Sequence, residues 1–373
     1  MTTEQDQPGR MAELDGLRAI AVCMVLTWHF LGAIIDHRLG PWSIAVSRVT
    51  ILGRTGVDLF FVLSGFLITS IVLERRQAAL RFLATFYARR ALRIIPPYAL
   101  LALVFWAIVV AGVHTAAFNA DTPWWRHATF TQNLWMADAG RWGPNAISVT
   151  WSVAIEEHFY LFFPLVALAA PPRRLPSILV AVALLSCLFR AASYLGPASS
   201  HLAYVHTLSR LDGLAVGGLL AHAWRHPAFA AWFGRNRSAL RRLLLAAAVS
   251  VPLLTLVIAR DFGWHMFTWA HTYLTLLSAT LLLYVLGSLG SSSARWLRTP
   301  ALRRVGRLSY SIYLFHPLLL SLVFLLAQRE ELISGAADVA LAALALALTW
   351  VWASLSMKWY EKPLIDYGRR MSY

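Results

Sequence analysis

The chain has 373 residues, of which 58% are hydrophobic and only 14% are charged, and its formal net charge is +15. An average soluble domain carries about 25% charged residues, so this composition excludes a soluble globular domain and predicts an all-α, polytopic membrane protein. The positive charge is typical of the asymmetry between the two sides of a membrane protein, and it needs no nucleic acid partner.

Ten apolar runs are long enough to predict about ten transmembrane helices. The sixth of these runs is short and rich in glycine. The chain accordingly divides into an N-terminal tail (1–12), a ten-helix transmembrane domain (13–357) and a C-terminal tail (358–373). The predicted spans lie near residues 17–35, 56–73, 94–113, 149–170, 175–195, 204–224, 243–259, 266–288, 307–327 and 336–357.

The placement of arginine and lysine predicts the orientation of the chain. If both termini are cytoplasmic, the inner loops and tails hold 23 basic residues and the outer loops hold seven, while three more lie within spans. A ratio above three to one, spread over many short loops, indicates that both termini are cytoplasmic.

The first predicted span carries an arginine and a histidine on one helix face. Arg18 and His29 are eleven residues apart, which at about 100° per residue is three turns plus about 20°. They are separated by roughly 16 Å along the axis, so one lies at the membrane boundary and the other well inside. Asp15, three residues before Arg18, joins this polar stripe. Because charges inside a bilayer are costly, the stripe indicates a functional site.

The second span begins with Asp58 and carries Ser64 and Gly65 at mid-depth. Asp58 either caps the start of the helix or lines a cavity. Small residues inside a membrane helix favour close helix packing, and the alternative is a catalytic serine at position 64. In the stretch "FYARRALRIIPPY" that follows, Arg90 and Arg93 share a helix face and can clamp phosphate groups, although ordinary positive-inside charge also explains such a cluster.

The fourth span, within "TWSVAIEEHFYLFFPLV", places Glu156 and Glu157 inside the membrane. Counted from the predicted helix ends, Glu156 lies roughly 10 Å below the outer surface, and His29 lies roughly 18 Å from the inner surface of a core about 30 Å thick. A carboxylate at this depth can orient His29 as a base. The alternative is a structural contact that ties helices together, but a histidine, an arginine and two carboxylates together favour function.

Two later spans also carry polar residues. Asp212 is an intramembrane acid that Arg210, two residues earlier, can neutralise. The ninth span carries Tyr313, His316 and Pro317, so that His316 either lines a substrate cavity or bonds a backbone carbonyl freed by the proline. The sequence contains no Walker loop, dinucleotide fingerprint or zinc motif, and we expect no metal.

Seven segments in chain order resemble the acyltransferase-3 family of bacterial integral membrane acyltransferases. The resemblance runs from about residue 12 to 366. It implies acyl transfer to a surface polysaccharide, lipopolysaccharide O-antigen, peptidoglycan or a natural product such as a macrolide. Many members carry an esterase-like domain after an extra span, and its absence here predicts a stand-alone member. The segments are "LDGLRAIAVCMVLTWHF", "GVDLFFVLSGFLI", "FYARRALRIIPPY", "TWSVAIEEHFYLFFP", "RLDGLAVG", "LSYSIYLFHPL" and "WYEKPL".

The resemblance also implies roles for particular residues. The family's arginine–histidine motif corresponds to Arg18 and His29, and its RxxR motif corresponds to Arg90 and Arg93 on the cytoplasmic face, where acyl-CoA is available. We therefore expect His29 to act as general base or to activate the thioester, with a carboxylate as its partner. The expected catalytic residues are His29, Glu156, Glu157 and Arg18; the expected acyl-CoA-binding residues are Arg90, Arg93 and Arg18; the expected cavity-lining residues are Asp15, Asp58, Ser64, Trp151, Tyr313 and His316.

The predicted function is transfer of an acyl group, by default acetyl, from acyl-CoA to a hydroxyl of a cell-envelope carbohydrate in the bacterial inner membrane. A secondary metabolite such as a macrolide is the alternative acceptor. A transporter or flippase of a lipid-linked sugar is a rival, although no pair of matching broken helices is present. A glycosyltransferase is disfavoured, because the outer loop at 114–148 holds only two acids, Asp121 and Asp138.

Overall fold

The computed structural model describes residues 11–74, 79–196, 200–258 and 261–371, so most of the predicted N-terminal tail lies outside the described residues. Within these ranges the chain is almost entirely helical, and its β structure is limited to an isolated bridge between Ile35 and Ile333. The helices are α1 (Ala12–Thr27), α2 (Pro41–Thr50), α3 (Gly56–Glu74), α4 (Ala79–Val110), α5 (Trp124–Ala128), α6 (Gln132–Ala139), α7 (Thr150–Ala169), α8 (Leu175–Leu195), α9 (Ser200–Val205), α10 (Thr207–Trp224), α11 (Pro227–Arg235), α12 (Arg237–Ile258), α13 (Phe262–His265), α14 (His271–Leu286), α15 (Pro300–Leu326), α16 (Ala336–Ser356) and α17 (Lys362–Arg370).

Eight helical segments of the described chain are long and apolar enough to cross a membrane, and each coincides with a predicted span. The sixth and seventh predicted spans form α10 and α12, which have 18 and 22 residues. α10 carries two charged residues, Arg210 and Asp212, in its first half. The predicted class, an all-α multi-pass membrane protein, is confirmed. The predicted C-terminal tail contains a helix, α17, which packs against α4.

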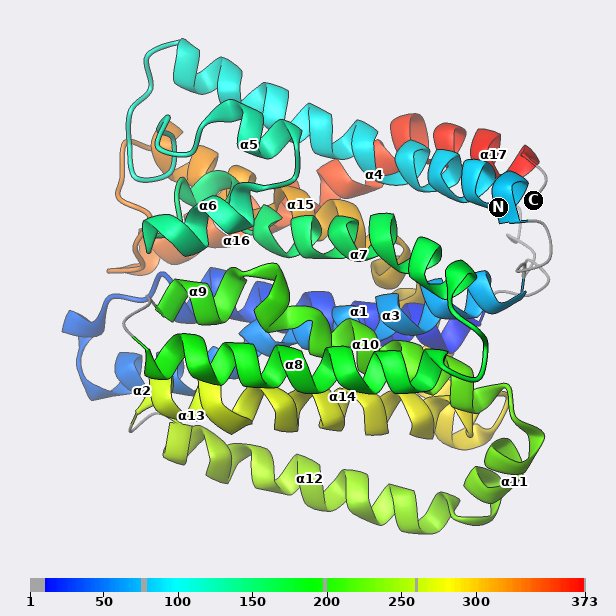
Figure 1. Ribbon diagram of the computed structural model, residues 1–373. Helices are drawn as coiled ribbons and strands as arrows, with labels where there is room; N and C mark the ends of the chain where they lie inside the picture. The colour runs from blue at the N-terminus through cyan, green and yellow to red at the C-terminus, as the bar shows by residue number, and fades with distance from the viewer. Residues whose placement is uncertain (1–10, 75–78, 197–199, 259–260, 372–373) are drawn as a thin grey trace.

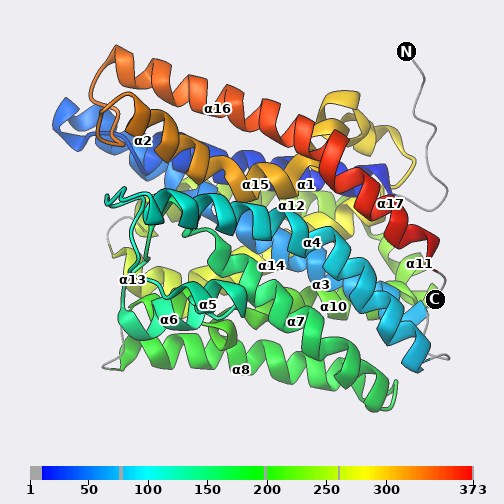
Figure 2. The ribbon, with the colours of Figure 1, turned by 90° about the horizontal axis from the view of Figure 1, so that it is seen from above.

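The long helices run roughly along one direction, and the short helices gather at the two ends of the bundle (Figure 1). α2, α5, α9 and α13 lie at one end, and α11 and α17 lie at the other. α1 begins at the end where α17 lies, and α1 and α3 pass through the middle of the bundle (Figure 2). Following the predicted orientation, we call the end with α11 and α17 the inner end and the opposite one the outer end.

Glycines allow the central helices to approach one another closely. A Cβ atom added at Gly65 would overlap the main chain of Leu214 on α10, and one added at Gly217 would overlap the main chain of Val62 on α3. Gly306 allows the same close approach between α15 and Asp15 on α1. Such contacts through the backbone are typical of packing between membrane helices. They determine how α1, α3, α10 and α15 are placed along one another.

A buried ion-pair network joins α3, α8, α10 and α14. Arg210 donates a hydrogen bond of 2.8 Å to Asp58, and His271 Nδ1 lies 3.5 Å from the same carboxylate oxygen. Arg190 donates to Asp212, also at 2.8 Å. All five side chains are buried. The predicted neutralisation of Asp212 by Arg210 is therefore wrong, because two residues on a helix differ by about 200° and face different neighbours.

Candidate active site

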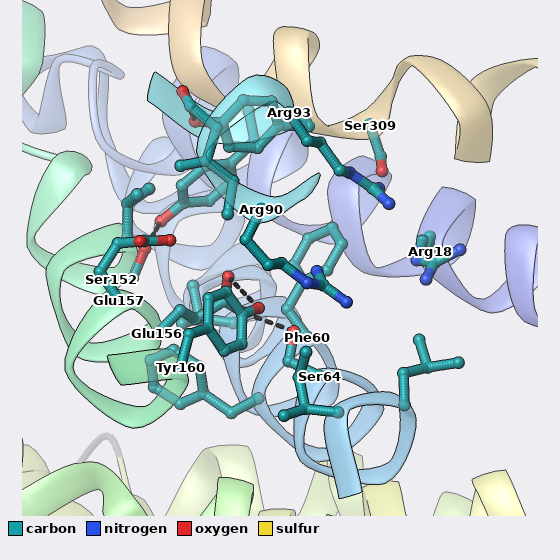
Figure 3. A pocket seen from close by; sticks show the side chains of 18 of the residues that line it. Arg18, Phe60, Ser64, Arg90, Arg93, Ser152, Glu156, Glu157, Tyr160 and Ser309 are labelled. Atoms are coloured by element: carbon teal, nitrogen blue, oxygen red, sulfur yellow. Dashed lines mark hydrogen bonds between the residues drawn. The ribbon is translucent and has the colours of Figure 1, made fainter. Parts of the chain in front are cut away.

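A cavity of about 240 Å³ lies between α1, α3, α4, α7 and α15 (Figure 3). Along α3 its wall runs from Val57 near the outer end to Ile71 near the inner end, a span of about 21 Å at 1.5 Å per residue. This wall is apolar except for Ser64. The polar and aromatic lining of the cavity comprises Arg18, Phe60, Phe61, Ser64, Arg90, Arg93, Ser152, Glu156, Glu157, Tyr160, Ser309, Tyr310 and Tyr313.

Three arginines line this one cavity. Arg18 comes from α1, and Arg90 and Arg93 come from neighbouring turns of α4 (Figure 3). Arg18 forms an ion pair with Asp15 at 2.9 Å, and the guanidinium carbon of Arg90 lies 5.1 Å from the ring centre of Tyr160. Guanidinium groups bind phosphate oxygens in pairs of hydrogen bonds, so this part of the cavity suits a ligand that carries phosphate.

The carboxylate of Glu156 is held in the cavity wall by two hydroxyl groups. Ser64 donates a hydrogen bond to Oε1 at 2.7 Å, and Tyr160 donates to Oε2 at 3.1 Å (Figure 3). Because the two donors come from different helices, both oxygens of the carboxylate are oriented. For this part of α3 the sequence predicts either close helix packing or a catalytic serine. In the structure, Ser64 faces the cavity and its neighbour Gly65 makes the close helix contact.

Glu157 presents a buried acceptor to the cavity. Its Oε1 atom has no hydrogen-bond partner within the described part of the chain. A buried polar atom without a partner is costly, so such an atom suits a donor that arrives with a ligand, for example an amide N–H or a hydroxyl.

Aromatic rings lead from the outer part of the cavity to His29. Tyr313 shares a hydrogen bond of 2.6 Å with Ser152, and both side chains line the cavity. His316 lies one turn further along α15, with its ring centre 5.9 Å from that of Tyr313. The rings of His316 and His29 are 4.8 Å apart between centres and meet edge to face.

His29 lies in a π-helical turn, Trp28–Gly32, at the outer end of the first span. Its Nδ1 atom is 2.9 Å from the carbonyl oxygen of Val25. Because a carbonyl oxygen only accepts, Nδ1 carries the proton and Nε2 is the basic nitrogen. Single π-helical turns within α-helices are frequent at functional sites. The local backbone therefore sets the tautomer that a general base requires.

His316 follows the second of the two predictions made for it. Pro317 has no N–H group, so the carbonyl of Tyr313 loses its normal helix donor. His316 Nδ1 takes that place at 2.8 Å. The side chain is buried, and its Nε2 atom is without a partner among the described residues. His316 thus bonds the freed carbonyl and packs against His29, and it does not line the cavity.

The structure contradicts the expected contact of His29 with Glu156 or Glu157. Glu156 bonds to Ser64 and Tyr160, whereas the ring beside His29 belongs to His316. Similar depths along two helices do not bring two side chains together, because each helix's rotation about its axis decides where its side chain points. Glu156 points towards α3, and His29 points towards α15.

Only two of the six residues expected to line the cavity do so, namely Ser64 and Tyr313. Asp15 is paired with Arg18, and Asp58 is paired with Arg210. Trp151 is buried, with its ring centre 5.3 Å from that of Tyr204. These buried partners keep the side chains of Asp15, Asp58 and Trp151 behind the cavity wall.

The sequence interpretation missed Ser152, Tyr160 and Ser309 in the cavity wall. Ser152 and Tyr160 lie four residues before and after Glu156, which is the spacing of side chains on one helix face. Ser309 lies four residues before Tyr313 on α15. Extending the helix faces of Glu156 and Tyr313 by one turn would have identified all three residues.

Comparisons with known proteins identify the family of the chain. The acyltransferase-3 family model, described as an acyltransferase domain, matches residues 11–356. O-acetyltransferase OatA of Staphylococcus aureus (strain NCTC 8325 / PS 47) is 28% identical over 383 residues, which cover 97% of this chain and 58% of that protein. Peptidoglycan O-acetyltransferase OatA of Listeria monocytogenes serovar 1/2a (strain ATCC BAA-679 / EGD-e) is 26% identical over 379 residues, which cover 95% of this chain and 56% of that protein.

The chain thus spans less than two thirds of the length of the curated relatives it matches. No solved structure matches it. Because the family model extends from the start of α1 to the end of α16, the chain belongs to the acyltransferase-3 family of membrane acyltransferases.

Proposed function

We propose that the protein is an O-acyltransferase that moves an acyl group, by default acetyl, from acyl-CoA to a hydroxyl of a cell-envelope carbohydrate. The observation that carries the proposal is a cavity that contains three arginines and whose lining residue Tyr313 packs against His316, the ring that in turn meets His29. The names of the two relatives, an O-acetyltransferase and a peptidoglycan O-acetyltransferase, support an acetyl donor and a cell-wall acceptor.

The cavity suits acyl-CoA entering from the inner end. Its phosphate groups would bind Arg18, Arg90 and Arg93. The pantetheine arm would follow the apolar wall of α3, whose length of about 21 Å fits an extended arm of this kind. An amide N–H of the arm would donate to Glu157 Oε1, which satisfies that buried acceptor. The thioester would then reach Ser152 and Tyr313.

In the transfer step, the acceptor hydroxyl attacks the thioester carbonyl carbon while His29 Nε2 takes the hydroxyl proton. The new C–O bond forms, the C–S bond breaks, and the CoA sulfur leaves and takes up the proton that His29 had accepted, which restores the neutral imidazole. The hydroxyl pair of Ser152 and Tyr313 lies where the thioester carbonyl would arrive. Both hydroxyls are also within hydrogen-bond distance of the Val149 carbonyl, at 3.1 and 3.2 Å, so one of them would turn from that carbonyl to donate to the thioester oxygen. The products are the acyl ester and free CoA.

The proposed location is the bacterial inner membrane, with the ends of α11 and α17 facing the cytoplasm. The excess of basic residues at that end supports this orientation. Acyl-CoA is then available on the inner side, and the acceptor arrives from the outer side or laterally from the bilayer. A secondary metabolite such as a macrolide remains the alternative acceptor.

The test is release of free CoA by purified protein given acetyl-, propionyl- or longer acyl-CoA together with a cell-wall glycan fragment. We expect His29→Ala to reduce the rate by about 10²- to 10⁴-fold, which is the usual contribution of a general base. The matched control is His37→Ala, because His37 is an exposed histidine of the outer loop. Both variants should elute from a sizing column as wild type does.

Two results would contradict the proposal. Normal turnover by His29→Ala would remove His29 from the reaction. Absence of acyl-CoA consumption by wild type with every acceptor, together with movement of a lipid-linked sugar across vesicles, would support a transporter.

A further inference from the structure

Three aromatic rings surround an arginine at the outer end of the bundle. The guanidinium carbon of Arg54 lies 4.5 Å from the ring centre of Tyr204, 5.5 Å from that of Trp28 and 5.7 Å from that of Trp142. Arg54 Nε also donates a hydrogen bond of 3.2 Å to the Tyr204 hydroxyl. The ring of His201 lies 5.1 Å from that of Trp142. We call these five residues the Arg54 cluster.

The Arg54 cluster is assembled from distant parts of the chain and is accessible. Trp28 begins the π-helical turn at the outer end of the first span, Arg54 precedes α3, Trp142 lies between α6 and α7, and Tyr204 and His201 belong to α9. Tyr204 is buried and forms the floor, while the other four residues are partly exposed. Below this floor, the guanidinium carbon of Arg210, in the buried ion-pair network, lies 5.5 Å from the same Tyr204 ring.

The Arg54 cluster adjoins the proposed base. Trp28 directly precedes His29 in the π-helical turn, and Arg54 is within electrostatic reach of His29. Burial and the Arg54 charge lower the pKa of the His201 imidazole. His201 is therefore neutral at pH 7, and the positive charge of the cluster belongs to Arg54.

The chemistry of these groups indicates a class of ligand. The C–H faces of a sugar ring pack against flat indole and phenol rings, and a guanidinium group forms paired hydrogen bonds with a carboxylate. A purely structural cation–π contact would explain the ring distances. It would not require Trp28, Arg54, Trp142 and His201 all to remain partly exposed.

We propose that the Arg54 cluster is the acceptor-binding site, and that the acceptor is a sugar bearing a carboxylate. The sugar ring stacks on Trp142 and Trp28, and the carboxylate pairs with Arg54. This inference rests on the proposed function, since it places the acceptor hydroxyl beside His29 as the base.

Binding can be measured without any reaction. Two disaccharides that differ in one lactyl ether, N-acetylglucosaminyl-N-acetylmuramic acid and N,N′-diacetylchitobiose, are titrated by calorimetry into the full chain in phosphatidylcholine nanodiscs. These discs contain no anionic lipid to compete for Arg54. We expect wild type to bind the acidic disaccharide about tenfold tighter or more, which is the usual effect of a hydrogen bond to a charged group.

The variants separate charge from stacking. Arg54→Gln should bind both disaccharides equally, and Arg54→Lys should keep part of the preference, because lysine retains the charge but not the paired geometry. Trp142→Ala should weaken both. Trp124→Ala is the matched control, because Trp124 is an outer-end tryptophan that is 65% exposed and lies outside the cluster. Its binding should equal that of wild type.

The proposal would be overturned if wild type bound the two disaccharides with equal affinity, or if the preference for the acidic disaccharide survived in Arg54→Gln. Equal losses of affinity in Trp142→Ala and Trp124→Ala would overturn it as well. Binding of acyl-CoA to wild type alone tests the proposed function separately. If acyl-CoA binds and is consumed while the disaccharide preference is absent, this inference fails and the proposed function stands. If the preference is present but no acyl-CoA is consumed, the binding site stands and the acyl transfer fails.

Discussion

His29 and His316 are two imidazole rings with the same internal arrangement. In each ring Nδ1 faces a main-chain carbonyl of its own helix, so Nε2 is the accepting nitrogen. The rings differ in access, because His29 is partly exposed and His316 is fully buried. His29 is therefore the ring that an acceptor can reach, and His316 is a positioning residue that packs against it.

Replacing His316 tests this positioning role. His316→Phe fills the space but leaves the Tyr313 carbonyl without a donor, so the free energy of unfolding should fall by about 1–3 kcal/mol. His316→Asn keeps an N–H group and should lose less. Thermal unfolding in detergent measures both, and the pH profile of acyl transfer reports on His29. An unfolding temperature of His316→Phe equal to that of wild type would refute the role of the hydrogen bond, and an unchanged pH profile would refute the influence on His29.

At the scale of elements, α3 presents different residues to different neighbours. Ser64 reaches the cavity and Glu156 on α7, while the next residue, Gly65, lies against the main chain of α10. Successive residues on a helix differ by about 100°, so one helix can serve both neighbours. The close contact with α10 therefore sets the position of Ser64 relative to Glu156.

Gly65→Ala tests how closely α3 and α10 must pack. The added Cβ overlaps the carbonyl of Leu214, which cannot rotate away, so we expect a destabilisation of about 1–3 kcal/mol. The separation of the helices should also stretch the Ser64–Glu156 hydrogen bond and lower the rate of CoA release. Gly234→Ala on α11 is the control, because a Cβ there meets open space. A Gly65→Ala protein as stable and active as the control would contradict this account of the α3–α10 contact.

At the scale of the whole molecule, the buried ion pairs connect helices that are distant in sequence. Asp58 with Arg210 joins α3 to α10, and Arg190 with Asp212 joins α8 to α10. Two positive and two negative groups balance one another at buried positions, where an unpaired charge is very costly. The network lies behind the cavity wall and beneath Tyr204, so it supports both proposed ligand sites.

Asp58→Asn should be far more damaging than loss of a surface ion pair. It leaves the buried Arg210 charge without its carboxylate, and removing one partner of such a pair typically costs about 3–5 kcal/mol. The control is Asp121→Asn, whose partner Arg141 is largely exposed, and the expected loss is about 0–1 kcal/mol. Combining Asp58→Asn with Arg210→Met should restore part of the loss. Equal unfolding temperatures of Asp58→Asn and Asp121→Asn would contradict the structural importance of the network.

Most of the fold was predictable from the sequence. A segment that crosses a bilayer must satisfy its own backbone hydrogen bonds, so helices follow from apolar runs of sufficient length. The helical character and positions of the spans depend on contiguous residues, and this is why even the short sixth and the seventh spans form helices where expected. Groupings within one helix, such as Arg90 with Arg93 and Asp15 with Arg18, follow from helical spacing in the same way.

The tertiary structure alone decided which side chains meet across helices. It pairs Glu156 with Ser64, His29 with His316 and Arg210 with Asp58, and it gathers Trp28, Arg54, Trp142 and Tyr204 at the outer end. Each such contact depends on the rotation of a helix about its axis and on its height relative to its neighbours. Those two quantities are set by close packing at positions such as Gly65 and Gly306, and the period of a single helix does not contain them.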